Sequence, residues 1–154
     1  MTTHDKLVLV LHKLIGTGFK VSGEEIIYNE GVTPPTEAEI DAEITKIESG
    51  VYEIEQWRKT AILTRRKFML AYKRYPWGVG TLKQAIDSLI TTLLESSDEA
   101  EKEMGQVMEE SLAETTEFTR THPDVIEMAT AIGMSPEQID EFYKWAENEQ
   151  WRNK

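Results

Sequence analysis

The side chains of this chain that could perform metal or acid–base chemistry are few and poorly spaced for it. His4, His12 and His122 lie apart in the sequence and show no ligand spacing such as His-x-x-x-His, so the pattern predicts no metal site. Glu24–Glu25 and Glu109–Glu110 are adjacent pairs. Because neighbouring side chains on a helix or strand point to different faces, neither pair forms the carboxylate dyad of acid–base catalysis. Both pairs are interpreted as solvated surface.

Phosphate-binding and nucleophile motifs are missing as well. Gly78-x-Gly80 lacks the third glycine of a phosphate loop and follows no predicted strand. No nucleophile motif surrounds any serine, and the absence of cysteine removes thiolate and disulfide chemistry. The sequence therefore predicts a protein that is not an enzyme and that uses no cofactor.

The net charge of −11 is distributed unevenly over the chain. Residues Arg58–Tyr75 include seven bases and no acid, whereas Glu95–Glu117 contains nine acids and one base, Lys102. Oppositely charged blocks attract each other, so we expect these two to face each other, within a subunit or between subunits. The predicted charged interaction surface consists of Arg58, Arg65, Arg66, Lys67, Lys73 and Arg74.

The basic segment also carries the alternative functional hypothesis, a small nucleic-acid-binding regulator. Its cations alternate with aromatic residues that can stack on bases. These aromatic residues are Trp57, Phe68, Tyr72, Tyr75 and Trp77. The negative net charge opposes nucleic-acid binding, so the favoured interpretation places the aromatics in a core and pairs the cations with the acidic segment.

A second candidate for DNA binding is the helix pair predicted over Asp124–Ile132 and Pro136–Asn148. The short connection between them is typical of a helix-turn-helix. The second helix is strongly acidic, with Lys144 as its one base, and would repel phosphate. The pair is therefore interpreted as a structural helical hairpin.

A helix predicted over residues 34–62 organises the rest of the chain. Thr36 and Glu39 have the spacing of a capping box at its start. Gly50 and the stretch Thr60–Thr64 are weak points at which the helix can break. Five β-branched residues follow at steps of four, three, four and three, the heptad seam of a coiled coil that favours three or four strands. The predicted oligomer or partner interface is Ile40, Ile44, Ile47, Val51, Ile54 and Trp57.

On either side of this helix we expect two further modules. Residues 1–33 predict a short helix and a small β-hairpin with its turn at Ser22–Glu24. Residues 63–154 predict a helical bundle that ends in the helical hairpin, with a long acidic helix extending to about Thr121–His122. In the hairpin, Val125, Ile126, Ala129 and Ile132 are expected to face inward. An alternative packing folds the seam back on the Leu82–Leu94 helix in a monomeric bundle.

Several stretches resemble small proteins encoded in the tail regions of phages and prophages. Ile26–Glu30 followed by Pro34–Ile44 is similar to the hairpin end and helix entry of these proteins. Leu63–Ala71 is similar to their Thr-Arg-Arg-x-Phe-x-Leu-Ala segment, and Phe118–Pro123 with Ala131–Phe142 resembles their closing helical hairpin. The acidic segment and the basic segment depart from the family pattern, which suggests a partner specific to this phage.

The resemblance implies a structural component or assembly factor that binds a tail fibre or baseplate through protein–protein contacts, and it supplies no catalytic residues. The expected partners are a tail-fibre or baseplate protein and further copies of the chain, with a trimer favoured; membrane and nucleic acid are not expected. The sequence has no cleavable signal pattern and no apolar run of about 18 residues. The expected location is the virion tail, or the host cytoplasm during assembly.

Overall fold

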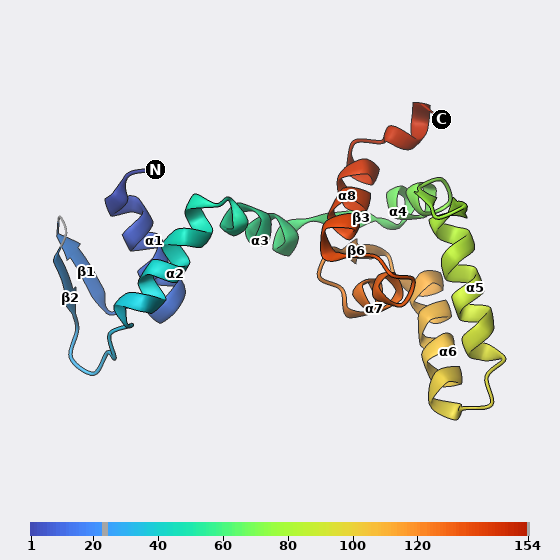
Figure 1. Ribbon diagram of the computed structural model, residues 1–154, viewed down its shortest axis with the longest axis horizontal. Coiled ribbons are helices and arrows are strands. Elements are labelled where there is room, and N and C mark those ends of the chain that lie inside the picture. The colour runs from blue at the N-terminus through green and yellow to red at the C-terminus, as the bar shows by residue number, and fades with distance from the viewer. Residues whose placement is uncertain (23–24, 154) are drawn as a thin grey trace. The chain divides into compact units, whose positions relative to one another are not determined.

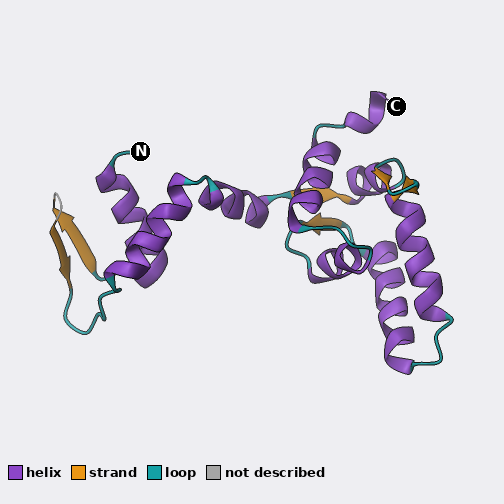
Figure 2. Ribbon diagram, in the orientation of Figure 1, coloured by secondary structure: helices purple, strands orange, loops and turns teal. Residues whose placement is uncertain are grey.

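The structure is a computed structural model that describes residues 1–22 and 25–153, with the backbone alone at 151 and 153 (Figure 1). Helices dominate, accompanied by short antiparallel strand pairs, which confirms the predicted mainly helical class (Figure 2). The chain divides into two compact units, Met1–Gln56 (unit 1) and Trp57–Lys154 (unit 2). Each unit has buried hydrophobic residues of its own.

Unit 1 contains the predicted short helix and β-hairpin. The hairpin strands pair antiparallel, with Phe19 opposite Tyr28 and Val21 opposite Ile26, which puts these four apolar side chains on one face. The predicted turn at residues 23–24 lies outside the described residues. The elements of unit 1 are α1 (Thr3–Ile15), β1 (Phe19–Ser22), β2 (Glu25–Tyr28), α2 (Glu37–Glu48) and the first part of α3 (Val51–Thr60).

The predicted capping box begins α2. The Glu39 N–H donates to the Thr36 hydroxyl at 3.3 Å, and the Thr36 N–H donates to the Glu39 carboxylate at 2.7 Å. The backbone and hydroxyl hydrogen bonds from Thr36 lower the pKa of the Glu39 carboxyl. Thr2 and Asp5 form an equivalent box at the start of α1, so local side-chain signals define where α1 and α2 begin.

The helix predicted over residues 34–62 is divided at both of its weak points. Ser49 caps the end of α2, and Gly50 has a φ of +76°, a left-handed conformation that ends a helix and suits glycine. α3 then begins at Val51 and ends at Thr60, where β3 follows after a single residue. The heptad seam therefore does not lie along one helix, and its coiled-coil pairing stays a prediction.

Unit 2 contains a larger set of elements around one hydrophobic core. Its strand pairs are β3 with β6 and β4 with β5. Thr64, Thr81, Asp98 and Ser135 act as helix N-caps, each accepting a hydrogen bond from a backbone N–H in the first turn of its helix. The elements are β3 (Ile62–Thr64), α4 (Arg65–Tyr72), β4 (Pro76–Trp77), β5 (Gly80–Thr81), α5 (Leu82–Leu94), α6 (Glu99–Glu114), β6 (Glu117–Thr119), α7 (Pro123–Ala131), α8 (Pro136–Glu147) and the 3₁₀ turn η1 (Gln150–Asn153).

The β3–β6 pair corrects the predicted course of the acidic helix. That helix was expected to extend to about Thr121–His122, but α6 ends at Glu114 and the chain turns into β6. In the pair, Leu63 lies opposite Phe118, and both side chains are almost fully buried. The flanking residues of each strand are more exposed, so a single apolar side chain in each three-residue strand points into the core.

The core of unit 2 joins α4, α5, α6, α7 and α8 with strands β3 and β6. The Phe68 ring stacks on the Phe118 ring with centroids 3.8 Å apart, and the Phe142 ring meets Phe68 edge-on at 5.5 Å. α6 packs closely on α5 because Gly105 has no side chain: a Cβ there would lie 3.0 Å from Leu93 Cβ. A larger residue at 105 would therefore separate the two helices.

The predicted helical hairpin is present as α7 and α8. Ile132 is the C-cap of α7 and is followed by Gly133, which has a φ of +84°. Ser135 forms a capping box with Gln138. One inward-facing assignment is wrong: Ile126 is exposed, and Met128 is buried in its place. The buried positions of α7 are Val125, Met128 and Ala129, with Ile132 packed against the core, which is the regular spacing of one helix face.

Candidate interaction surfaces

The six residues of the predicted oligomer interface lie in different environments. Ile47 is buried inside unit 1, and Ile40 and Ile44 are half-buried on α2. Val51 and Ile54 on α3 are exposed, at 41% and 42% of their surface. Trp57 is half-buried in unit 2, where the Lys144 Nζ lies 4.9 Å from the centre of its ring. The exposed part of the seam is therefore Val51 and Ile54.

Three residues of the basic segment pair with groups other than the acidic side chains of Glu95–Glu117, which the sequence predicts as their partners. Arg58 forms an ion pair with Asp140, which is described below. Lys67 forms an ion pair with Glu149 at 3.9 Å. Arg65 does reach the acidic helix, but it donates to the backbone carbonyls of Leu112 and Thr115, at 2.7 and 3.1 Å. Those carbonyls are the negative end of the helix dipole, so Arg65 neutralises the end of α6.

The other members of the charged surface and the neighbouring aromatics lie on opposite sides of the α4 region. Arg66, Lys73 and Arg74 are exposed, whereas Phe68 and Tyr72 are buried in the core. The remaining aromatics of the segment, Tyr75 and Trp77, pack against the core as half-buried side chains. The cations and aromatics that alternate in the sequence thus do not form one exposed stacking surface.

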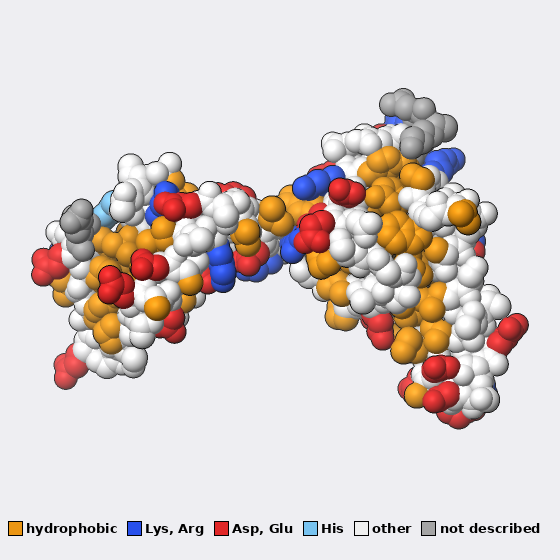
Figure 3. Space-filling view, viewed as in Figure 1, with side chains coloured by type: hydrophobic (Ala, Val, Ile, Leu, Met, Phe, Trp, Pro, Cys, Tyr) orange, Lys and Arg blue, Asp and Glu red, His pale blue; other side chains and the backbone are white. Residues whose placement is uncertain are grey.

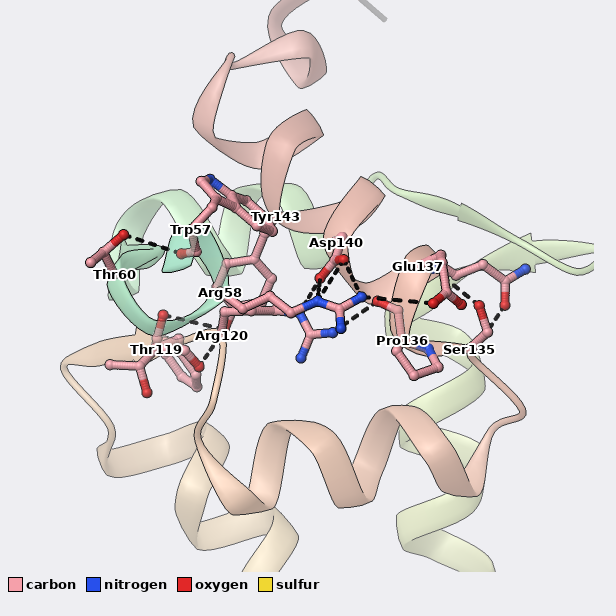
Figure 4. Close-up of polar contacts among 12 residues, drawn as sticks. Trp57, Arg58, Thr60, Thr119, Arg120, Ser135, Pro136, Glu137, Asp140 and Tyr143 are labelled. Atoms are coloured by element: carbon pink, nitrogen blue, oxygen red, sulfur yellow. Dashed lines mark hydrogen bonds and ion pairs between the residues drawn. The ribbon is translucent and has the colours of Figure 1, made fainter. Parts of the chain in front are cut away.

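The strongest polar grouping of the described residues is a cluster of two arginines on one aspartate (Figure 4). The Arg58 guanidinium donates to both carboxylate oxygens of Asp140, with contacts between 2.6 and 3.1 Å. The Arg120 Nε donates to the Asp140 Oδ1 at 2.7 Å. Arg120 and Asp140 are only 4% and 5% exposed, so their charges compensate each other where water cannot.

The surrounding contacts show that this cluster anchors α8 to β6 and α3. Arg120 also donates to the Pro136 carbonyl at 2.8 Å, in the first turn of α8. The Tyr143 hydroxyl donates to the carbonyls of Phe118 and Thr119, and burial raises the pKa of this phenol well above its usual range. The Asp140 carboxylate is held by both arginines, and the Tyr143 hydroxyl is held by backbone carbonyls, so the cluster has the chemistry of a clamp.

Asp140 and Arg120 were not identified from the sequence as residues that stabilise the fold. Asp140 follows the core residue Ile139 and precedes Phe142 and Tyr143, so a charge close to the apolar face of a predicted helix was the available signal. Such a position requires a buried cation as partner. Nothing in the spacing indicates that the partner is Arg120.

A serine, a histidine and an aspartate also meet at the start of α7. The Ser111 hydroxyl donates to the Asp124 carboxylate, and His122 Nδ1 lies 3.9 Å from the same carboxylate oxygen. In a hydrolase triad the histidine lies between the serine and the acid. Here the aspartate lies between the other two, so the serine hydroxyl meets a carboxylate where a triad has a histidine.

A shallow apolar groove of about 630 Å³ lies between α6 and α7, here called the α6–α7 groove. Exposed hydrophobic side chains gather over these helices in Figure 3. Met104 and Ile126 line the groove, and Val107 is exposed one helical turn along α6. The remaining lining residues are Thr121, Pro123, Glu127, Thr130 and Ala131.

Neither a metal cluster nor a membrane span is found in the part of the chain that the structure describes. No three His, Asp or Glu side chains gather there to hold an ion, and no helix there is both long and apolar enough to cross a bilayer. Comparison with known protein families, curated proteins and solved structures finds no match for the chain.

Proposed function

We propose that this protein is a non-enzymatic binding protein that acts through protein–protein contacts, as a structural component or assembly factor of a phage tail. The proposal has two parts with separate support. The binding role is supported by the packing of unit 1. The phage-tail setting is supported by the resemblance of Ile26–Glu30, Pro34–Ile44 and Leu63–Ala71 to tail-region proteins.

The observation that carries the binding role is the thin core of unit 1. Among its described residues, the buried hydrophobic side chains are Val10, Leu11 and Ile47. Domains of this size bury a small share of their surface and are marginally stable, and an isolated two-stranded hairpin is marginal. Val51 and Ile54 meanwhile expose apolar surface on α3. Unit 1 therefore gains stability when another surface covers it, which is the behaviour of a docking module.

Ion pairs support the fold of unit 1 without replacing a core. The Lys13 ammonium donates to Glu43 at 2.5 Å and to Glu55 at 3.3 Å, and Lys46 donates to Glu43 at 2.6 Å. The hydrogen bonds from Lys13 and then Lys46 lower the pKa of the Glu43 carboxyl. Contacts of this partly exposed kind contribute about 0.2–1 kcal/mol each, less than one well-buried leucine.

The alternative function, nucleic-acid regulation through residues 58–75, has less support. Phe68 and Tyr72 are buried in the core, and Arg58 and Arg65 are held by Asp140 and by the end of α6. A salt titration of binding to a non-specific DNA duplex separates the two functions. Steeply salt-dependent micromolar binding would favour the regulator.

Self-association through the exposed seam can be tested with Val51→Asp and Ile54→Asp in the full chain. Both side chains are exposed, so the variants test the interface without opening the core, which Ile47→Asp would do. Ile27→Asp is the matched control, because Ile27 is an equally exposed residue of unit 1 on β2. Sedimentation should show an oligomer that the two seam variants dissociate and the control retains. A monomeric parent protein would refute the oligomeric role of the seam.

The phage-tail setting needs a separate experiment. Mass spectrometry of purified particles from a host that encodes the protein should detect its peptides in the tail fraction, or fibre assembly should fail when the gene is inactivated. Complete, infectious tails formed without the protein, together with its absence from the particles, would refute this part of the proposal.

A further inference from the structure

The α6–α7 groove has the surface that a partner helix would occupy. Met104, Val107 and Ile126 each expose between 36% and 43% of their surface, and the walls of the groove are almost entirely apolar. Apolar side chains three and four residues apart on a helix form a continuous stripe. Two helices with a shared apolar groove are a common docking site for a third, amphipathic helix.

The charge around the groove defines which helix would fit. Glu127 lines the groove itself, and Glu101, Glu103 and Glu110 are exposed within one helical turn of Met104 or Val107. Within α6 and α7 the one lysine or arginine is Lys102, which pairs with Glu99 at 2.7 Å. An apolar strip with an acidic border attracts a helix that has an apolar stripe flanked by basic residues.

We propose that the α6–α7 groove binds a basic amphipathic helix of a partner protein. This assignment rests on the proposed function, because it specifies the chemistry of one partner for a protein that acts by binding. It also concerns unit 2, whereas the seam of α3 that is tested for self-association is exposed in unit 1.

Other occupants fit the groove less well. Nucleic acid and anionic lipid surfaces carry phosphate, which the acidic border repels. A second copy of the chain offers one strongly basic helix, α4, but its apolar side, with Phe68, Ala71 and Tyr72, is already buried in the core of unit 2. The occupant is therefore a helix other than those that the described residues of this chain form.

The test measures binding of a labelled peptide to the full chain by fluorescence anisotropy. The probe is a peptide of about 18 residues, or five helical turns, with leucines at helical i, i+3 and i+4 spacing and lysines elsewhere. A peptide of the same composition with the order scrambled separates groove binding from general charge attraction. A third peptide with glutamates in place of lysines tests the sign of the charge.

Two groove variants and two controls make the test specific. Met104→Gln combined with Ile126→Gln should weaken binding at least about 10-fold, because two apolar contacts are lost. Glu127→Lys should weaken it about 3-fold or more at low salt. Val79→Gln changes a fully exposed residue at the β4–β5 turn of the same unit, and Glu147→Lys reverses an exposed charge on α8. Both controls should bind like the parent protein.

Several results would overturn the assignment. Equal binding of the scrambled peptide, or equal weakening by Val79→Gln and by the Met104→Gln/Ile126→Gln pair, would show that the groove is not the site. A change of self-association in the groove pair would assign the groove to a second copy. If peptide binding fails while Val51→Asp and Ile54→Asp still dissociate an oligomer, the groove assignment falls and the proposed function stands.

Discussion

Replacing Asp140 by asparagine is the sharpest test of the arginine–aspartate cluster. The substitution keeps the shape of the side chain but removes the charge that compensates two guanidinium groups. Arg58, with 27% of its side chain exposed, can regain water, whereas the Arg120 side chain, 5% exposed, cannot. The Arg120 guanidinium then keeps its hydrogen bond to the Pro136 carbonyl but has no carboxylate to balance its charge. The amide also presents donor hydrogens to the guanidinium groups.

The expected loss follows from these contacts. Removing one partner of a buried ion pair costs about 3–5 kcal/mol. Because asparagine keeps one acceptor oxygen and Arg58 rehydrates, we expect the lower end, about 3 kcal/mol. For a unit of this size each kcal/mol lowers the thermal midpoint by about 4–8 °C, so the midpoint of unit 2 should fall by at least about 12 °C.

Tryptophan fluorescence is a suitable assay, because all four tryptophans follow Gln56 and report on unit 2 alone. Glu141→Gln is the control: it removes a neighbouring acid on the exposed side of α8 and should cost less than about 0.5 kcal/mol. Asp140→Leu combined with Arg120→Met should be more stable than Asp140→Leu alone, since both buried charges are then removed. If Asp140→Asn unfolds no earlier than Glu141→Gln, the cluster does not stabilise unit 2 and this reasoning is wrong.

Three further predictions concern single contacts. Gly50→Ala puts a side chain at a φ of +76° with open space around it, so backbone strain alone should destabilise the α2–α3 turn by about 1 kcal/mol and speed its hydrogen exchange, with Gly50→Asn less affected. The lowered pKa of Glu43 means that its contribution to stability is present above its unfolded pKa and is lost as the pH falls through the folded value. The hydrogen-exchange protection factors of α1 and α2, taken relative to intrinsic exchange at each pH, should therefore fall below about pH 4.5, and less steeply in Glu43→Gln. Tyr143→Phe removes the hydroxyl that donates to the carbonyls of Phe118 and Thr119 and should lower the free energy of unfolding of unit 2 by about 1–2 kcal/mol in a urea titration followed by tryptophan emission. An unchanged urea midpoint for Tyr143→Phe would contradict the buried geometry.

The features that the sequence predicts best are those with local causes. A cap requires a short polar side chain and a partner three residues on, so Thr36 and Ser135 could be recognised without any knowledge of the fold. Gly50 was recognised as a weak point because glycine is a poor helix former. What the sequence could not decide is whether the heptad seam would carry the helix through Gly50, because that depends on what the helix packs against.

The features that could not be predicted depend on distant partners. β3 and β6 have three residues each, and each has one buried side chain. Three residues are too few to show the alternation of apolar and polar side chains that marks a strand. Residues 115–119 therefore resemble the continuation of an acidic helix until Leu63 is placed opposite Phe118. For the candidate surfaces, Ile126 looks like a core residue by type, and only the packing of α7 shows that it faces the groove.

The long sequence separation of the contacts in unit 2 has a consequence for synthesis. Arg58 and Asp140 are 82 residues apart, and β3 meets its partner strand more than fifty residues later. Unit 1, in contrast, makes its contacts within the first 56 residues, and domains generally fold in the order in which they leave the ribosome. A nascent chain therefore presents unit 1 while β3 is still an unpaired edge, and a partner that covers unit 1 can bind before the second half of the protein has been made.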